Sequence, residues 1–257
     1  MTRLTNDCVR YPLMLAVAGL ALAGPTGTSA QADTIAWDSM TGVTNTFFFP
    51  GSPGRSFVGQ ALSLDASAPL TLTGFDTVLL SGAAQTGLLR LNVSVWGGFS
   101  PTTSPVFSNL LYTESFNFSS TSLALNGIYV LQSATAGVPR FTFTTPVALP
   151  ASSPVGITLN WQIDTGTGAG FVNSDALTTA VRATVPLAVG TNLNGISPNF
   201  GFFRNASGQT DGNFLPSDGR TVGANSAISL RLYTVPTPGT AALLGLGGLL
   251  ASRRRRA

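Results

Sequence analysis

Residues 155–164 read VGITLNWQID, and this stretch decides the fold class. Its apolar side chains occupy every second position, namely Val155, Ile157, Leu159, Trp161 and Ile163. Successive side chains of a β-strand point to opposite faces, so strict alternation is typical of a strand with one buried and one polar face. The stretch therefore predicts a half-buried antiparallel strand.

The same alternation recurs on both sides of this stretch. It is clear in Leu89–Val95 and Ile228–Leu232, and a phase break near Gly74 indicates a β-bulge in a further strand. The weaker candidate strands are Phe57–Leu64, Leu70–Leu80, Val106–Phe118, Ile128–Gln132, Phe141–Val147 and Gly201–Phe203. About nine strands separated by Gly, Pro, Ser and Asn clusters predict an all-β antiparallel sandwich or jelly roll.

One stretch carries helix signals. Ser174 or Asp175 could cap a helix that runs to Ala183, although the β-branched residues Thr178, Thr179 and Val181 weaken this prediction.

The composition fits a folded, turn-rich domain and excludes several catalytic classes. The 257 residues are 44% hydrophobic and 9% charged, with 29 glycines and 16 prolines. There is no histidine, all 13 basic residues are arginine, and Cys8 is the single cysteine. Ser-His-Asp triads, Cys-His pairs, histidine zinc sites and lysine nucleophiles are therefore excluded. Only carboxylate chemistry remains, so a carboxylate-dependent glycoside hydrolase is a low-ranked alternative.

The positive charge gathers at the two ends of the chain. Between Asp33 and Val235, seven arginines face nine acidic residues, so this middle part is neutral to slightly acidic. Phosphate binding needs clustered basic side chains, and these arginines are scattered. We therefore expect no nucleic-acid partner.

The N-terminus has the pattern of a secretory signal peptide. Arg3 and Arg10 accompany the apolar run Leu13–Ala23, and a small-residue segment follows. Ala30 and Ala32 form an A-x-A cleavage signature for signal peptidase, which predicts a signal peptide over 1–32, with cleavage after Ala30 as the alternative. The exported chain would then hold no cysteine, so disulfides would not stabilise it.

The C-terminus carries a second composite signal. An extended segment of Val235, Pro236, Thr237, Pro238 and Gly239 precedes the apolar stretch Thr240–Ser252, and Arg253, Arg254, Arg255 and Arg256 follow. The arginines favour the cytoplasmic side of a membrane, and the apolar stretch is shorter than the ~20 residues of an ordinary transmembrane helix. The tail therefore predicts a temporary anchor.

This tail resembles the PEP-CTERM sorting signal of Gram-negative bacteria, in which a Val-Pro-Glu-Pro-like motif precedes an apolar helix and an arginine cluster. Thr237 stands where the family usually has Glu. The resemblance implies that an exosortase, a membrane transpeptidase, is a partner. It also implies a transient inner-membrane anchor and delivery to the cell exterior in bacteria that make exopolysaccharide.

Glu114, the only glutamate, is one candidate ligand-binding residue. In its strand it shares the even phase with Leu110, Tyr112 and two phenylalanines. If that phase faces inward, Glu114 needs a partner such as Arg90 or Arg140, or must keep its proton. A structural role, such as an inward charge that discourages edge pairing, is the alternative to ligand contact.

Phe47, Phe48 and Phe49 are the second candidate for a binding surface. Three consecutive aromatic residues in a strand cannot all point inward, so at least one should be exposed or lie under a loop.

Asp211, Asn213 and Asp218 form an oxygen-rich loop that could hold calcium. The spacing of a helix-loop-helix calcium site is missing, and a solvated turn is the preferred interpretation. No other cofactor is expected.

The sequence thus predicts three segments. These are a signal peptide (1–32), an all-β sandwich (33–233) and a sorting segment (234–257) that ends in a hydrophobic helix. We expect a non-catalytic surface or extracellular-matrix protein associated with exopolysaccharide, with a carbohydrate-binding module as the alternative.

Overall fold

The computed structural model describes residues 33–41, 47–48, 57–64, 69–100, 107–151, 154–174, 176–182, 189–192, 203–204 and 227–236. These residues form strands, turns and bends, and none of them lies in a helix. All strand pairs among them are antiparallel. The predicted all-β antiparallel class is therefore confirmed.

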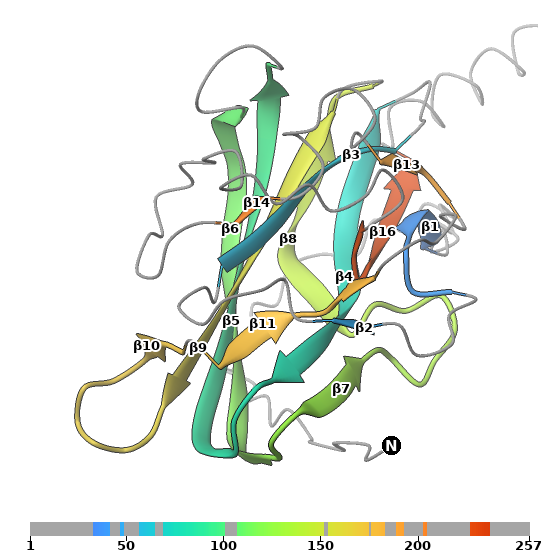
Figure 1. Cartoon of the computed structure of the whole chain (residues 1–257). Coiled ribbons are helices and arrows are strands. Elements are labelled where there is room, and N and C mark those ends of the chain that lie inside the picture. Colours follow the sequence, from blue (N-terminus) through green and yellow to red (C-terminus); the bar gives the residue numbers. More distant parts are fainter. Residues whose placement is uncertain are drawn as a thin grey trace, which may run out of the picture.

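The largest sheet has seven strands. Its order is β13-β3-β9-β5-β6, with β10 beside β9 and β14 beside β3, and Figure 1 shows β5, β6 and β9 side by side. The bounds are β3 Phe57–Ser63, β5 Gln85–Phe99, β6 Phe107–Leu123, β9 Val155–Asp164, β10 Val172–Asn173, β13 Thr191–Asn192 and β14 Phe203–Arg204.

The second sheet has six strands around β4. Its order is β1-β16-β4-β11, and both β7 and β8 also pair with β4. The bounds are β1 Thr34–Asp38, β4 Leu70–Ser81, β7 Gly127–Leu131, β8 Phe141–Leu149, β11 Leu177–Thr179 and β16 Leu230–Pro236. A third, small sheet has the order β15-β12-β2, with β15 Ala227–Ile228, β12 Val181–Arg182 and β2 Phe47–Phe48.

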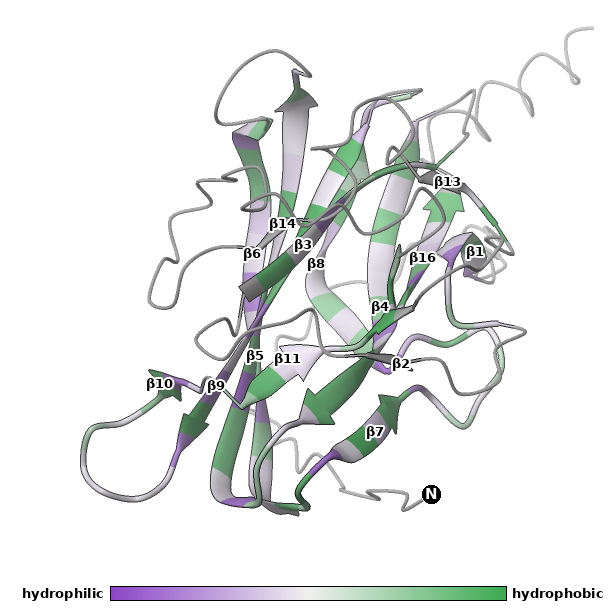
Figure 2. Cartoon of the chain, viewed as in Figure 1, coloured by the Kyte–Doolittle hydropathy of each residue, from purple (hydrophilic) through white to green (hydrophobic). Residues whose placement is uncertain are grey.

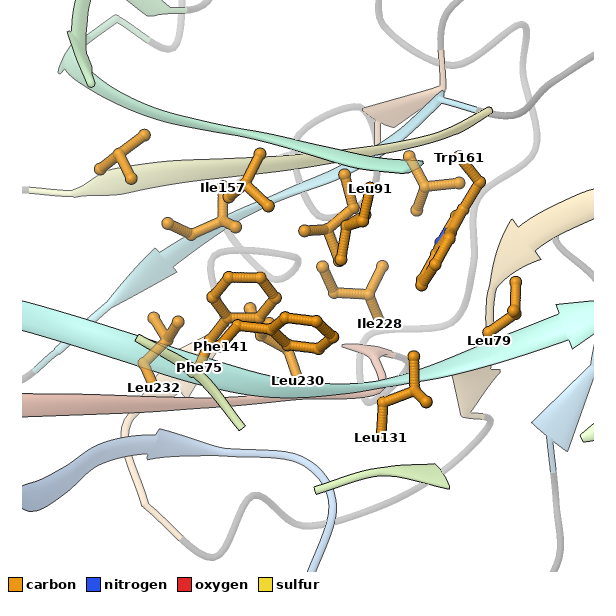
Figure 3. Close-up of a cluster of buried hydrophobic side chains, with 14 of the residues drawn as sticks. Phe75, Leu79, Leu91, Leu131, Phe141, Ile157, Trp161, Ile228, Leu230 and Leu232 are labelled. Carbon is orange, nitrogen blue, oxygen red and sulfur yellow. The ribbon is translucent and has the colours of Figure 1, made fainter. Parts of the chain in front are cut away.

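The two large sheets share one hydrophobic core. The inward residues of β9 and β5 meet those of β4, β8 and β16 in a single buried cluster. Figure 3 shows Leu91, Ile157 and Trp161 pointing from one layer toward Phe75 and Phe141 of the other. The alternation that predicted the strands is visible as alternating bands of hydropathy in Figure 2. The arrangement is sandwich-like.

The bulge predicted near Gly74 is present. The pairing register of β4 shifts at this point against both β8 and β16. A Cβ atom at Gly74 would collide with the carbonyl oxygen of Phe141, so only glycine fits without movement of the neighbouring strand.

Two local expectations are wrong. The helix expected over 174–183 is absent from the described residues 176–182, because Leu177–Thr179 pairs with Leu79–Ser81 of β4 and Val181 continues into the small sheet. The expected strand Ile228–Leu232 is interrupted at Ser229, where the chain passes from the small sheet to the six-stranded sheet. Tertiary pairing overrides local preference in both places.

β16 connects the core to the tail. Thr234 pairs with Thr34 of β1, and the Thr34 hydroxyl donates to the Thr234 carbonyl at 3.0 Å. The strand continues through Val235 to Pro236, three residues beyond Tyr233, where the sequence placed the end of the domain. The segments before Thr34 and after Pro236 therefore attach to neighbouring strands at the same end of the sheet.

Candidate functional site

The outer surface of the seven-stranded sheet carries a group of amide, hydroxyl and guanidinium side chains, which we call the polar face. These residues alternate with core residues along their strands and so point away from the core. The polar face consists of Arg90, Asn92 and Ser94 on β5, Thr113, Ser115 and Asn117 on β6, Thr158, Asn160 and Gln162 on β9, and Asn173 on β10.

The strand register arranges these side chains in rows across the sheet. One row runs Asn117, Arg90, Gln162, Asn173; the next runs Ser115, Asn92, Asn160; and the third runs Thr113, Ser94, Thr158. The rows cross three or four strands, so the polar face spans β6, β5, β9 and β10.

A chain of hydrogen bonds links the second row to β10. The Ser115 hydroxyl donates to Asn92 Oδ1 at 2.6 Å, and Asn92 Nδ2 donates to Asn160 Oδ1 at 3.0 Å. Asn160 Nδ2 and Gln162 Nε2 both donate to Asn173 Oδ1, at 3.1 and 3.2 Å. Connected amides polarise and orient one another, so these hydrogen-bonded side chains are held in one arrangement.

Exposure increases across the polar face from β9 to β6. Thr158 and Asn160 are buried, the β5 side chains are half-buried, and Thr113, Ser115 and Asn117 are exposed. The sequence predicted a polar outer face for β9, but it did not predict that Thr158 and Asn160 would be buried. Their hydrogen bonds, including one from Trp96 Nε1 to Thr158 at 3.0 Å, make that burial tolerable.

Arg90 is the charged member of the polar face. Its guanidinium carbon lies 3.8 Å from the centre of the Phe171 ring, and its Nε donates to Asn117 Oδ1 at 2.9 Å. Phe171 follows Gly170, which has a φ of +69°, at the end of the β9–β10 loop seen at the lower left of Figure 1. The loop therefore brings the ring beneath the guanidinium.

The side chains of this face offer hydrogen-bond donors and acceptors to a ligand. Amides offer both donors and acceptors, and hydroxyls can do either.

Glu114 does lie on the inner side of β6, but its partners are not arginines. Glu114 Oε1 accepts from the Thr144 hydroxyl at 2.6 Å, and Oε2 accepts from the Thr144 N–H at 3.0 Å and the Tyr112 hydroxyl at 2.8 Å. The Tyr112 hydroxyl in turn accepts from the Thr145 N–H at 3.3 Å. Burial, and then the hydrogen bond to Glu114, raises the pKa of Tyr112.

Glu114 thus joins the β6 edge of one sheet to the β8 edge of the other. Thr144 and Thr145 lie where the register of β8 against β4 shifts, so their N–H groups are free to reach β6. The predicted partners lie elsewhere, since Arg90 is on the polar face and the Arg140 N–H donates to Asp76. Leu110 also departs from the predicted inward phase, because it is 48% exposed at a register shift between β5 and β6.

A buried charged cluster lies on the outer side of the six-stranded sheet. Arg231 Nε donates to Asp38 Oδ2 at 3.0 Å, and its Nη1 lies 3.5 Å from Asp76 Oδ2. Tyr233 donates to the same Asp76 oxygen at 2.8 Å. Burial raises the pKa of Asp76 despite these donors, and burial with the Asp76 hydrogen bond raises the pKa of Tyr233 to about 12. Sequence reasoning did not find this cluster.

The aromatic candidates are only partly described. Phe47 and Phe48 form β2 and pair with Arg182 and Val181, and Phe49 lies outside the described residues. Trp37 and Trp161 are fully buried and Trp96 is 8% exposed, so none of the three tryptophans presents its ring as a sugar platform.

Several predicted site residues lie outside the described part of the chain. They are the cleavage residues Ala30 and Ala32, the calcium candidates Asp211, Asn213 and Asp218, and the tail residues Thr237, Pro238, Gly239 and Arg253 to Arg256. Within the described residues, no group of three or more acidic, histidine or cysteine side chains could hold a metal ion, and no helix is long and apolar enough to cross a membrane.

Comparison with known proteins adds no assignment. A scan against models of protein families finds no match, and no curated protein matches the sequence.

Proposed function

We propose that the chain is an exported, non-catalytic β-sandwich protein that associates with exopolysaccharide at the cell surface or in the extracellular matrix. The observation that carries this proposal is the polar face, a broad hydrogen-bonding surface built on rigid strands. A signal peptide over 1–32 and a sorting tail from Thr234 onward would bring the domain to the cell exterior.

A polysaccharide fits this face because it offers hydroxyls along an extended chain. Exposed Thr113, Ser115 and Asn117 make hydrogen bonds within the sheet and keep further donor or acceptor capacity for sugar hydroxyls. The amide chain behind them is already ordered by its own hydrogen bonds, which lowers the entropic cost of binding.

Co-sedimentation of the full-length protein in detergent with insoluble polysaccharides tests the proposal. The triple variant Thr113→Ala/Ser115→Ala/Asn117→Ala should weaken binding by about tenfold or more, since each lost hydrogen bond contributes about 1 kcal/mol. The matched control, Gln132→Ala/Thr135→Ala/Thr142→Ala, removes three exposed polar side chains elsewhere and should bind like the wild type. Equal binding by both triple variants would show that the polar face is not the site.

The tail makes a separate prediction about processing. The resemblance to PEP-CTERM signals implies cleavage by an exosortase after the Arg253–Arg256 block has set the orientation in the membrane. Deleting these four arginines, or replacing Pro238, should leave uncut precursor in the membrane fraction or mislocalise it. Mass spectrometry of the protein from the cell exterior decides the matter, because a mature species that still ends at Ala257 contradicts the sorting role.

The position of β16 supports membrane insertion of the tail followed by its cleavage. The strand carries Val235 and Pro236 directly out of the sheet, so processing of the tail would leave the paired part of the strand attached to the domain. The segment before Thr34 attaches beside it, so both targeting segments would hold the same end of the domain at the membrane.

A further inference from the structure

The guanidinium of Arg90 has no acidic partner in the described part of the chain. Its interactions there are the Nε hydrogen bond to Asn117 and the stacking on Phe171. Asp164 is the nearest acidic residue by strand register, opposite Leu88, and its Oδ1 accepts the Gly166 N–H instead. Arg231 differs from Arg90, because its nitrogens donate to Asp38, Asp76 and Thr41.

The geometry leaves the terminal nitrogens of Arg90 available to a ligand. The Phe171 ring covers one face of the guanidinium, and Asn117 fixes the orientation of its plane through Nε. Neither contact uses Nη1 or Nη2, which are the groups that form paired hydrogen bonds with a carboxylate. Holding the plane in advance lowers the entropic cost of such a contact.

Arg90 is the group of the polar face that favours an anionic ligand over a neutral one. The other nine members are amides and hydroxyls, and Asp164, which continues the outward phase of Gln162 at the end of β9, is the acidic side chain at the rim of this face. The domain as a whole is neutral to slightly acidic, so attraction of an anion would come from this one position.

We infer that Arg90 is an anion subsite that binds the carboxylates of an acidic, uronate-type polysaccharide, while the neighbouring amides and hydroxyls bind its sugar hydroxyls. The inference rests on the proposed function and specifies its ligand class. Lysine at position 90 would not replace Arg90 fully. Its compact ammonium group neither stacks as a plane on Phe171 nor forms the paired contact with a carboxylate.

Two polymers with one backbone provide the test, namely polygalacturonate and its neutral methyl ester. The full-length protein should bind polygalacturonate at least tenfold more tightly than the ester. Arg90→Gln should remove this preference, and Arg90→Lys should restore only part of it. Arg140→Gln, which removes an exposed arginine directly before β8, should leave the preference unchanged.

The possible failures of the two proposals can be told apart. Equal binding of both polymers by the wild type, or a preference that survives in Arg90→Gln, overturns the anion subsite and leaves polysaccharide binding in place. Binding of neither polymer, nor of any other polysaccharide in the co-sedimentation assay, overturns both. Thermal unfolding of Arg90→Gln should match that of the wild type, so that a loss of preference cannot be assigned to misfolding.

Discussion

Replacing Arg231 with methionine should destabilise the domain by about 3 kcal/mol, because it leaves two buried carboxylates without their cation. Asp38 and Asp76 are 2% and 1% exposed, and Arg231 bridges them. Methionine keeps much of the apolar stem and removes the charge. Urea unfolding at neutral pH, followed by tryptophan fluorescence, measures the change in the free energy of unfolding.

Arg90→Met is the matched control for this prediction. Arg90 is half-buried and bonded to a neutral amide, so its loss should cost less than about 1 kcal/mol. Adding Asp76→Asn to Arg231→Met should recover part of the lost stability. An Arg231→Met effect no larger than that of Arg90→Met would contradict a stabilising role for the cluster.

The loss of unfolding free energy caused by Arg231→Met should grow as the pH rises. Burial already raises the pKa of Asp76, and removing a nearby cation raises it further. A carboxyl with a raised folded-state pKa contributes stability that is fully present below its unfolded pKa of about 3.9 and is lost as pH rises through the folded value. The gap between variant and wild type should therefore widen from about pH 4 toward neutrality.

Replacing Phe75 with alanine should cost about 4 kcal/mol of unfolding free energy. The side chain is fully buried in the centre of β4. Its ring stacks on Phe141 at 4.8 Å between centroids and packs edge-on against Phe116 at 5.8 Å, so the substitution creates a cavity between the two sheets (Figure 3). Denaturant unfolding measures the effect, which should not vary with pH.

Two further variants show whether the cavity is the cause. Phe75→Leu fills most of the space and should cost less than half as much. Phe171→Ala removes a half-buried ring at the rim of the polar face and should cost about 1 kcal/mol. If Phe75→Ala proved no more destabilising than Phe171→Ala, the core assignment of β4 would be wrong.

The strands that the sequence predicted best are those whose pattern is longest. Val155–Ile163 and Leu89–Val95 lie inside β9 and β5, and the phase break near Gly74 marks a real bulge. Short strands such as β10 and β13 were missed, because two residues carry no periodicity. The stretch from Ser174 carries helix-capping residues, which are local signals, whereas its pairing with β4 is a long-range contact that no local signal reveals.

The candidate site was only half visible in the sequence. The polar phases of β5 and β9 contain Arg90, Asn92 and Asn160 at regular spacing, and that pattern could have indicated a shared face. Phe171 and Asn173 could not have been added, because they follow a loop and join the face only through the pairing of β10 with β9.

By itself, the sequence determined the all-β fold class and excluded histidine- and lysine-dependent chemistry, because alternation is visible in consecutive residues and composition needs no structure. It also grouped Glu114 with Tyr112 and two phenylalanines in one phase of its strand. Only the tertiary structure decided that Glu114 bonds to Thr144, that Arg231 lies between two buried aspartates, and that Arg90 stacks on Phe171. These contacts join residues that lie 30 to 193 positions apart in the sequence. They therefore depend on which strands pair and in which register. That choice is made by burial of the whole core, which no local stretch encodes.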